Sequence, residues 1–159
     1  RNEAKVGKMI GELKLSAALL AAGMEVRAAE SVEELADQSR LIVTATSAHE
    51  PVLRADQVRP GTHITAMGSD DDGKQELDVA LLAKADRIVA DSVSQCSKYG
   101  ECVHAINAGV ISLDDIAELG AVVSGSTDGR TSDDQITIAD LTGVAVQDIQ
   151  IAKMIARAL

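Results

Sequence analysis

Apolar residues follow two alternating periodicities along this chain. Short runs rich in β-branched residues, typical of buried strands, alternate with stretches in which apolar residues recur every three or four positions, typical of amphipathic helices. Strands are predicted at 25–29, 41–46, 62–66, 87–90 and 136–140. Helices are predicted at 2–22, 31–39, 76–85, 93–108, 114–121 and 146–159. Because strand and helix alternate in units of roughly 20 residues, the pattern predicts an α/β fold with a parallel sheet and right-handed crossovers.

A polar, glycine-rich connection at 124–134 interrupts this alternation. It has no apolar face, and its composition is typical of a solvent-exposed loop. We therefore predict that the first four strands form the sheet, which resembles a Rossmann-type sheet lacking its first strands. The C-terminal strand and helix, 136–159, are predicted to pack away from that sheet or on a partner chain.

The composition narrows the range of partners. A net charge of −10 over 159 residues repels nucleic-acid phosphates and anionic lipid, and no basic run offsets it. No apolar run reaches the roughly 18 residues of a membrane span, and the N-terminus has no secretory pattern. We expect a cytoplasmic protein with no nucleic-acid or membrane partner, in which Cys96 and Cys102 are free, buried thiols.

Candidate chemistry is concentrated in residues 63–77. The strand predicted to end at Ala66 is followed by an acidic loop that contains two glycines and a single lysine, Lys74. In open α/β sheets ligands bind beyond the carboxyl ends of the strands, so Asp70 is the first candidate for a catalytic group. The ordinary alternatives are a solvated loop for the aspartates and a surface position for the lysine. His63 fits a hydrogen-bonded structural histidine better than a base.

Other polar residues give weaker signals. His49 and His104 share no metal-ligand spacing with cysteines or carboxylates, so no metal site is predicted. Asp133, Asp134 and Asp140 fit a second acidic constellation, and they fit helix capping and loop solvation equally well. The sequence leaves both alternatives open.

Several segments, in the right order, resemble the ornithine cyclodeaminase/mu-crystallin family. The resemblance covers nearly the whole chain. It is carried by LIVTAT at 41–46, EPVL at 50–53, PGTHITAMGSD at 60–70, GK at 73–74, EL at 76–77, DRIVADS at 86–92, ELG at 118–120, GRTSDDQIT at 129–137 and DLTGVAVQD at 140–148. Within the family, TAMGSD at 65–70 and SDDQIT at 132–137 resemble the ectoine-utilisation cyclodeaminase branch most.

The resemblance implies an NAD(P)-dependent homodimer that acts on a small amino acid. In the cyclodeaminases the cofactor takes a hydride from the α-carbon, the side-chain amine closes on the resulting imine, ammonia leaves, and the hydride returns to the ring. Residues 1–123 would be the distal part of the Rossmann-type dinucleotide-binding domain. Residues 124–159 would return to the substrate and dimerisation domain.

The resemblance also implies roles for single residues. Asp70 matches the catalytic aspartate, which handles protons on the amine, and Thr142 matches a position beside the substrate. The positions that match cofactor contacts are Thr46, Ala66, Met67, Gly68, Lys74 and Leu141. Asp71 and Asp72 depart from the family pattern, in which many relatives have an uncharged residue and proline, so the substrate stays open.

Most of the binding features expected of the family are absent from these 159 residues. No G-x-G-x-x-G/A motif occurs, so the sequence offers no phosphate cradle at a helix N-terminus. Arg1 falls at or just after the second Rossmann strand, where an arginine accommodates the 2′-phosphate of NADP(H), and a solvated strand-end arginine is the alternative. The cofactor is thus NAD or NADP. We expect the chain alone to show no turnover and at best weak dinucleotide affinity.

Three functions fit the sequence. The first is the distal part of a cyclodeaminase that acts on a small diamino acid. The second is a reductase of a cyclic ketimine, or a dehydrogenase of an α-amino acid such as alanine, from the same family. The third is a non-catalytic module that keeps the fold and a dimer surface without turning over.

Overall fold

The computed structural model describes residues 3–16 and 21–158 and divides the chain into two compact units, Arg1–Leu35 and Ala36–Leu159. In the first unit, helix α1 (Glu3–Lys14) is followed by residues 24–29, which are described and form no strand. The predicted strand at 25–29 is therefore wrong. A strand needs a neighbour to satisfy its backbone groups, and no strand occurs in the described part of this unit. The predicted helix 2–22 ends at Lys14, and its residues 2 and 17–20 lie outside the described part.

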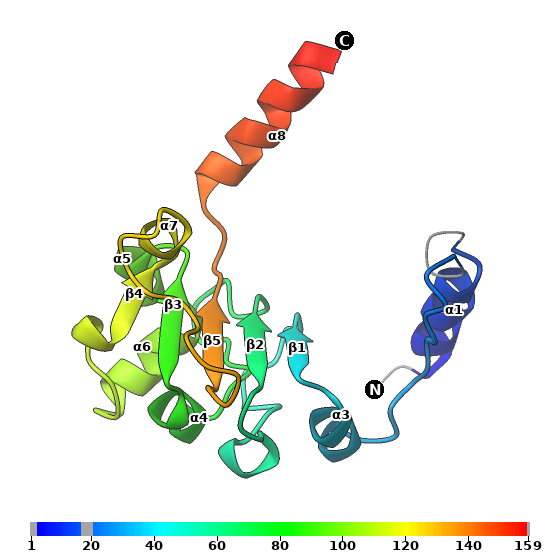
Figure 1. Ribbon diagram of the computed structural model, residues 1–159, viewed down its shortest axis with the longest axis horizontal. Helices are drawn as coiled ribbons and strands as arrows, with labels where there is room; N and C mark the ends of the chain where they lie inside the picture. Colours follow the sequence, from blue (N-terminus) through cyan, green and yellow to red (C-terminus); the bar gives the residue numbers. More distant parts are fainter. Residues whose placement is uncertain (1–2, 17–20, 159) are drawn as a thin grey trace. The chain divides into compact units, whose positions relative to one another are not determined.

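The second unit is built on a five-stranded sheet in which all strand pairs are parallel (Figure 1). The strands are β1 (Leu41–Thr44), β2 (His63–Ala66), β3 (Arg87–Ala90), β4 (Ile116–Glu118) and β5 (Thr137–Asp140). Their order across the sheet is β1-β2-β5-β3-β4. The predicted α/β class with a parallel sheet is confirmed.

One row of isoleucines crosses all five strands. The strand register pairs Ile42, Ile64, Ile138, Ile88 and Ile116 in that order, and all five side chains are buried. Burial of one large aliphatic side chain contributes on the order of 2 kcal/mol, so this row fixes the register of the sheet.

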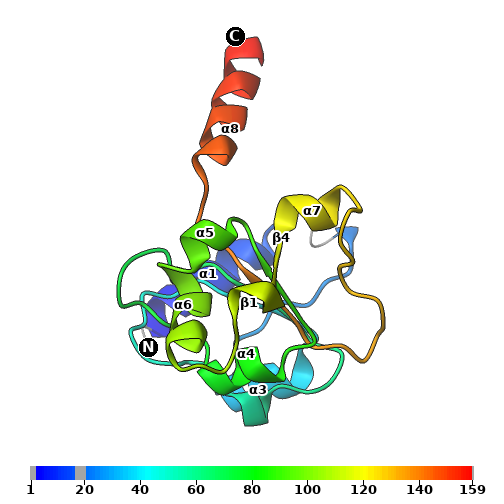
Figure 2. The same ribbon diagram turned by 90° about the vertical axis from the view of Figure 1, so that its left-hand side faces the viewer.

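Helices α4 (Val79–Lys84) and α6 (Gly100–Asn107) pack against each other and against this core. Leu81 and Leu82 of α4 and Ala105 of α6 are fully buried in it. Figure 2 looks onto the β4 side of the sheet, where α5 (Val93–Cys96) lies next to α6. The remaining helices are α3 (Val32–Gln38), α7 (Leu119–Val123), α8 (Ala145–Ala158) and the 3-10 turns η1 (Ala55–Gln57) and η2 (Leu113–Asp115).

The C-terminal strand is the main departure from the predicted architecture. β5 lies in the centre of the sheet, between β2 and β3, and not away from it (Figure 1). Its residues are mostly buried, which is what the centre of a parallel sheet requires of an apolar run. The polar connection at 124–134 crosses the surface and returns the chain to the sheet. A boundary at residue 124 therefore does not separate the sheet from the C-terminal segment, whereas α8 has no buried residue.

Two helix predictions also need correction. The predicted helix 93–108 is split because Tyr99 is extended and Gly100 has φ +86°, in the left-handed region that favours glycine. The predicted helix 114–121 is replaced by η2, β4 and α7. Its Ile116 faces the core as a strand residue, because pairing with Ile88 buries it better than a short surface helix does.

Two other expectations can be compared directly with the structure. Cys96 and Cys102 are free and buried, as predicted, and burial raises the pKa of Cys96 to about 12. Within residues 3–16 and 21–158, no helix has the length and apolar character needed to cross a membrane.

Candidate functional site

The candidate site lies at the carboxyl edge of the sheet. Because the strands are parallel, the segments after β1, β2 and β5 leave at the same edge, and these three strands are neighbours. The Met67 N–H donates to the Thr44 carbonyl at 2.9 Å, and the Leu141 N–H donates to the Ala66 carbonyl at 2.9 Å. The structure thus brings together the predicted positions from three segments that are far apart in sequence.

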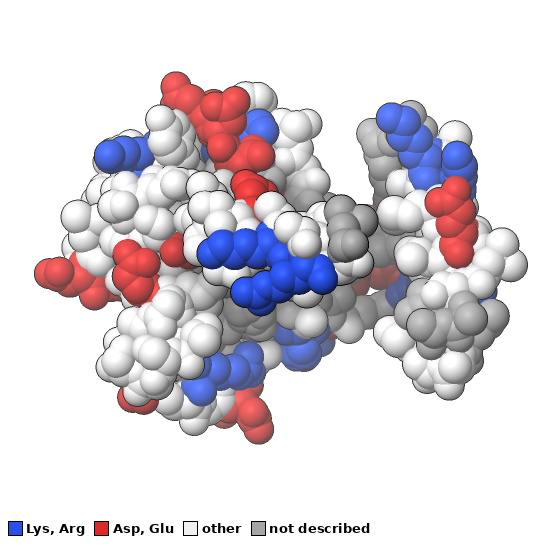
Figure 3. Space-filling model, turned by 90° about the horizontal axis from the view of Figure 1, so that it is seen from above, with Lys and Arg blue, Asp and Glu red and all other residues white. Residues whose placement is uncertain are grey.

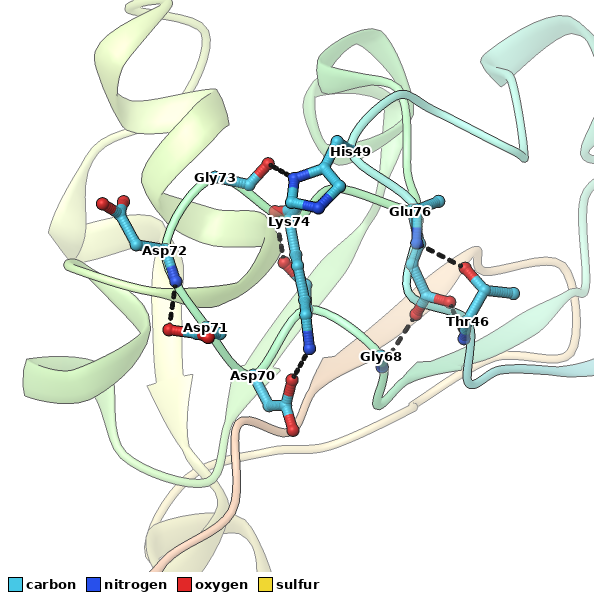
Figure 4. A network of polar contacts seen from close by, with 11 residues as sticks. Thr46, His49, Gly68, Asp70, Asp71, Asp72, Gly73, Lys74 and Glu76 are labelled. Atoms are coloured by element: carbon cyan, nitrogen blue, oxygen red, sulfur yellow. Dashed lines mark hydrogen bonds and ion pairs between the residues drawn. The ribbon is translucent and has the colours of Figure 1, made fainter.

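Asp70 and Lys74 form an ion pair in the loop after β2. The Lys74 Nζ lies 2.6 Å from the Asp70 Oδ1, and Figure 4 shows the lysine side chain reaching across the loop to it. This hydrogen bond lowers the pKa of Asp70 below its usual value and raises the pKa of Lys74. The Asp70 side chain is 55% exposed, so an ionised carboxylate faces solvent at the edge where a ligand would bind.

Two histidines hold this loop through its backbone. Nδ1 of His49, which follows β1, lies 2.9 Å from the Gly73 carbonyl, and Nε2 of His104 in α6 lies 2.7 Å from the Lys74 carbonyl. A carbonyl only accepts, so each of these ring nitrogens carries the proton. The Ser69 hydroxyl also donates to the Lys74 carbonyl, at 2.6 Å. The position of Lys74 is therefore set by neighbours on both sides.

The side chains of Asp71 and Asp72 form no hydrogen bond with the Asp70–Lys74 pair in the described part of the chain. The Asp71 carboxylate accepts the Asp72 N–H at 2.8 Å, which is a local turn contact, and both residues are exposed. Figure 4 shows the Asp72 side chain pointing away from Lys74. For these two aspartates the structure agrees with the ordinary interpretation as a solvated loop.

A buried carboxylate, Glu76, joins the segments after β1 and β2, and sequence reasoning missed it. Glu76 is fully buried, and its Oε1 accepts the Thr46 N–H at 2.5 Å. Its Oε2 accepts the Gly68 N–H at 2.9 Å (Figure 4). The same oxygen accepts the Thr44 hydroxyl at 2.6 Å. The sequence placed Glu76 at the start of a helix, but α4 begins at Val79 with Asp78 as its N-cap.

Two further buried carboxylates, those of Glu101 and Asp140, are linked to Glu76 by hydrogen bonds. Glu101 accepts the N–H groups of Glu76 and Leu77 at 2.8 and 2.9 Å, and Asp140 accepts those of Glu101 and Cys102 at 3.0 and 2.9 Å. Burial raises the pKa of Glu101 to about 7 and also raises the pKa of Asp140. For Asp140, of the two alternatives left open, the structure supports the capping role, because it accepts N–H groups at the start of α6. In the sequence, the only indication of this role was that Asp140 directly follows an apolar run.

Thr142 lies beside this edge, but its hydroxyl is already engaged. The Gln95 Nε2 donates to its Oγ1 at 2.9 Å, and the Thr142 hydroxyl donates to the Asp91 carboxylate at 3.3 Å. Asp91, just after β3, accepts the Gly143 N–H at 2.8 Å, and Gln95 of α5 donates to the Gly143 carbonyl at 2.7 Å, so the turn after β5 is tied to both. His63 is likewise engaged, since its ring nitrogens contact the hydroxyls of Thr137 and Thr65, as expected for a structural histidine.

Arg1 lies outside the described residues, so its predicted contact with the cofactor stays a prediction. On the face drawn in Figure 3, acidic and basic side chains each form several separate groups. A cavity of about 330 Å³ lies at the amino end of β3, lined by charged residues that include Asp86, Arg87 and Asp115. It is at the edge opposite the one where parallel sheets bind ligands.

The parallel sheet and the loops at its carboxyl edge define a Rossmann-type α/β domain. The chain belongs to the ornithine cyclodeaminase/mu-crystallin family, whose model matches residues 10–159. It is 45% identical over 148 residues to the iminosuccinate reductase of Paracoccus denitrificans and 46% identical over 128 residues to the alanine dehydrogenase of Archaeoglobus fulgidus. These alignments cover 93% and 79% of this chain but only 45% and 39% of the two relatives.

Solved structures support the same assignment. An archaeal alanine dehydrogenase dimer with bound NAD matches with a TM-score of 0.83 and 39% identity, over 96% of this chain and 45% of that chain. A lysine cyclodeaminase matches with a TM-score of 0.72 and 31% identity, over 87% and 39% of the two chains. The chain therefore spans less than half the length of these relatives.

Proposed function

We propose that this chain is the distal part of the dinucleotide-binding domain of an NAD(P)-dependent enzyme that acts on a small amino acid. The observation that carries the proposal is the convergence of an exposed, ionised Asp70 with the backbone of Thr46, Gly68 and Leu141 at one sheet edge. Relatives that are named as dehydrogenases, reductases and a cyclodeaminase support the same class of chemistry.

The residues that would hold the dinucleotide are the predicted ones, Thr46, Ala66, Met67, Gly68, Lys74 and Leu141, with Arg1 outside the described part. The two segments that would hold it lie side by side, because the backbone at Gly68 passes so close to the Thr46 carbonyl oxygen that no Cβ fits there. When bound, the nicotinamide supplies a hydride acceptor and donor at the carbon that bears the amine.

Asp70 would handle the proton on the substrate nitrogen. Its carboxylate takes one proton from the substrate ammonium, which leaves the nitrogen lone pair free to form the C=N bond as hydride leaves the carbon. In the reverse direction the protonated carboxyl returns this proton to the nitrogen. The pairing with Lys74 keeps Asp70 ionised, and therefore able to accept a proton, at neutral pH.

Two reactions remain as candidates for the complete enzyme. In a cyclodeaminase, a second amine of the substrate closes on the imine carbon and ammonia leaves. In a reductase the reaction begins from an imine, and in a dehydrogenase water hydrolyses the imine to a keto acid and ammonia. Identities of 45% to the iminosuccinate reductase, 46% to the alanine dehydrogenase and 41% to an uncharacterised cyclodeaminase of Sinorhizobium fredii support both reactions.

We also propose that the protein is a homodimer, in which α8 packs against a surface other than the sheet of its own chain. All residues of α8 are exposed, among them Val146, Ile149, Met154 and Ile155, each more than half exposed. Exposed apolar side chains gathered on one helix mark a surface that gains stability when another surface covers it. The alanine dehydrogenase relative is described as a dimer, which supports the same assembly here.

A fusion protein tests the catalytic assignment of Asp70. In the fusion, this chain replaces the segment of the Paracoccus denitrificans reductase with which it aligns. Asp70→Asn is expected to lower kcat by about 10²-fold or more, the usual scale for a lost acid–base group. Asp72→Asn, which removes an equal charge from the same loop, is the matched control and is expected to keep kcat within about twofold of the parent, because Asp72 faces away from the ion pair.

The assays distinguish the candidate reactions. Ammonia release from ornithine, lysine or diaminobutyrate without net NADH formation indicates a cyclodeaminase. NAD⁺ reduction with alanine indicates a dehydrogenase, and NADH oxidation with a cyclic imine or iminosuccinate indicates a reductase. Equal kcat values for Asp70→Asn and its parent would remove Asp70 from the mechanism. A fusion that folds but has no activity on any of these substrates would support the non-catalytic module.

A further inference from the structure

Glu76 is a buried carboxylate that is held by hydrogen bonds. Its carboxylate is fully buried, and within residues 3–16 and 21–158 it forms no salt bridge. Removing a carboxylate from water is costly unless its oxygens are well satisfied. Here two backbone N–H groups and one hydroxyl supply three donors. An apolar residue would fill the same space without this cost. We therefore attribute the role of Glu76 to the hydrogen bonds that its two oxygens accept.

The two N–H donors belong to the two segments that carry the proposed cofactor contacts. Thr46 follows β1 and donates to Oε1, whereas Gly68 follows β2 and donates to Oε2. One rigid carboxylate therefore sets the distance between these two backbone segments. A Cβ on Gly68 would lie 2.2 Å from the Thr46 carbonyl oxygen, which shows how close the two segments are held.

The backbone of Glu76 is held in turn by a second buried carboxylate. Its backbone N–H and that of Leu77 donate to the two oxygens of Glu101, which is also fully buried. The Glu101 N–H in turn donates to Asp140, at the end of the central strand β5. The carboxylate that spans the two loops is thus connected to the middle of the sheet by a chain of hydrogen bonds from backbone N–H groups to side-chain carboxylates.

We infer that Glu76 is a positioning residue for the dinucleotide site: it holds the segments after β1 and β2 at the separation that their backbone contacts with the cofactor require. This inference rests on the proposed function. Glutamine cannot take over the role, because its amide offers one acceptor oxygen and its NH₂ group would oppose the N–H of Thr46 or Gly68. Aspartate keeps the charge but is one methylene shorter, so it cannot reach both segments.

The test measures NADH binding to the fusion protein by fluorescence, together with its thermal unfolding. Glu76→Gln is expected to weaken NADH binding by about tenfold or more in protein that is still folded at the assay temperature, the scale of one lost charge-assisted hydrogen bond. Thr44→Val is the matched control. It removes the hydroxyl that donates to the same carboxylate but leaves both N–H contacts, so it is expected to lower Tm while Kd stays within about twofold.

Each outcome decides between the alternatives. If Glu76→Gln lowers Tm but keeps the parent's Kd for NADH, Glu76 supports only the fold and the inference is wrong, while the proposed function stands. If Glu76→Gln does not fold, Glu76→Asp replaces it, and parental affinity in that variant overturns the inference. Failure of the unmutated, folded fusion to bind NADH contradicts the proposed function and the inference together.

Discussion

Replacing Gly68 with alanine is expected to destabilise the sheet-containing unit by about 3 kcal/mol, the upper range for overpacking at a site that cannot relax. A Cβ at this position would lie 2.2 Å from the Thr46 carbonyl oxygen and 2.5 Å from the Glu76 carboxylate. The first of these is a backbone atom, so no side-chain rotation relieves the clash. Chemical denaturation of the 159-residue chain measures the loss directly.

Gly120→Ala is the matched control for this prediction. Gly120 lies in helix α7, and a Cβ there would meet no atom within 4 Å. Alanine favours the helix by up to about 1 kcal/mol over glycine, so this variant is expected to be as stable as the parent or more stable. Equal stability of the Gly68→Ala and Gly120→Ala variants would show that the segments after β1 and β2 are not in close contact.

The stability of the chain is expected to fall as pH rises from about 5 to 8, because of Glu101. Burial, together with the nearby carboxylates of Asp140 and Glu76, raises the pKa of Glu101 from 4.5 to about 7. In this range the folded state therefore keeps a proton that the unfolded state has released. Stability is then highest below the unfolded pKa and decreases as pH approaches the folded pKa, by about 3 kcal/mol for a shift of this size.

Glu101→Gln removes this titration. The variant is expected to be less stable than the parent at pH 5, because its NH₂ group opposes the N–H of Glu76 or Leu77, and the two stabilities are expected to converge as pH rises. Asp115→Asn is the control, since hydrogen bonds from Ser112 lower the pKa of Asp115 and place its titration below this range. Parallel curves for the parent and Glu101→Gln between pH 5 and 8 would contradict the assignment.

Local sequence patterns predicted most of the strands, because the formation of a strand depends mainly on residues that are close together in the sequence. β1 and β3 are short β-branched runs between polar residues, and the structure has them where the pattern placed them. The order of the strands is not local information. The run at 137–140 was recognised as a strand, but nothing in it says that it enters the sheet between β2 and β3.

The candidate site was predictable to a similar extent. The family motifs pointed to Asp70, Thr46, Gly68 and Leu141, and the parallel topology brings these positions to one edge. The buried carboxylates were not predictable, because Glu76 and Glu101 are ordinary surface residues by type. Glu76 gains its buried N–H partners from the segments after β1 and β2, and Glu101 gains its partners from the packing of α6 under the loop after β2. Tertiary hydrogen bonds of this kind leave no periodicity in the sequence.

Titration of the ¹⁵N-labelled 159-residue chain with NAD⁺, followed by amide NMR spectra, tests most directly whether the carboxyl edge of this sheet is a dinucleotide site. We predict weak binding, with the largest shift changes at the amides of Thr46, Met67, Gly68 and Leu141. Shift changes that are absent, or that appear at the amino end of β3 around Asp86 and Arg87 instead, would contradict the proposed site.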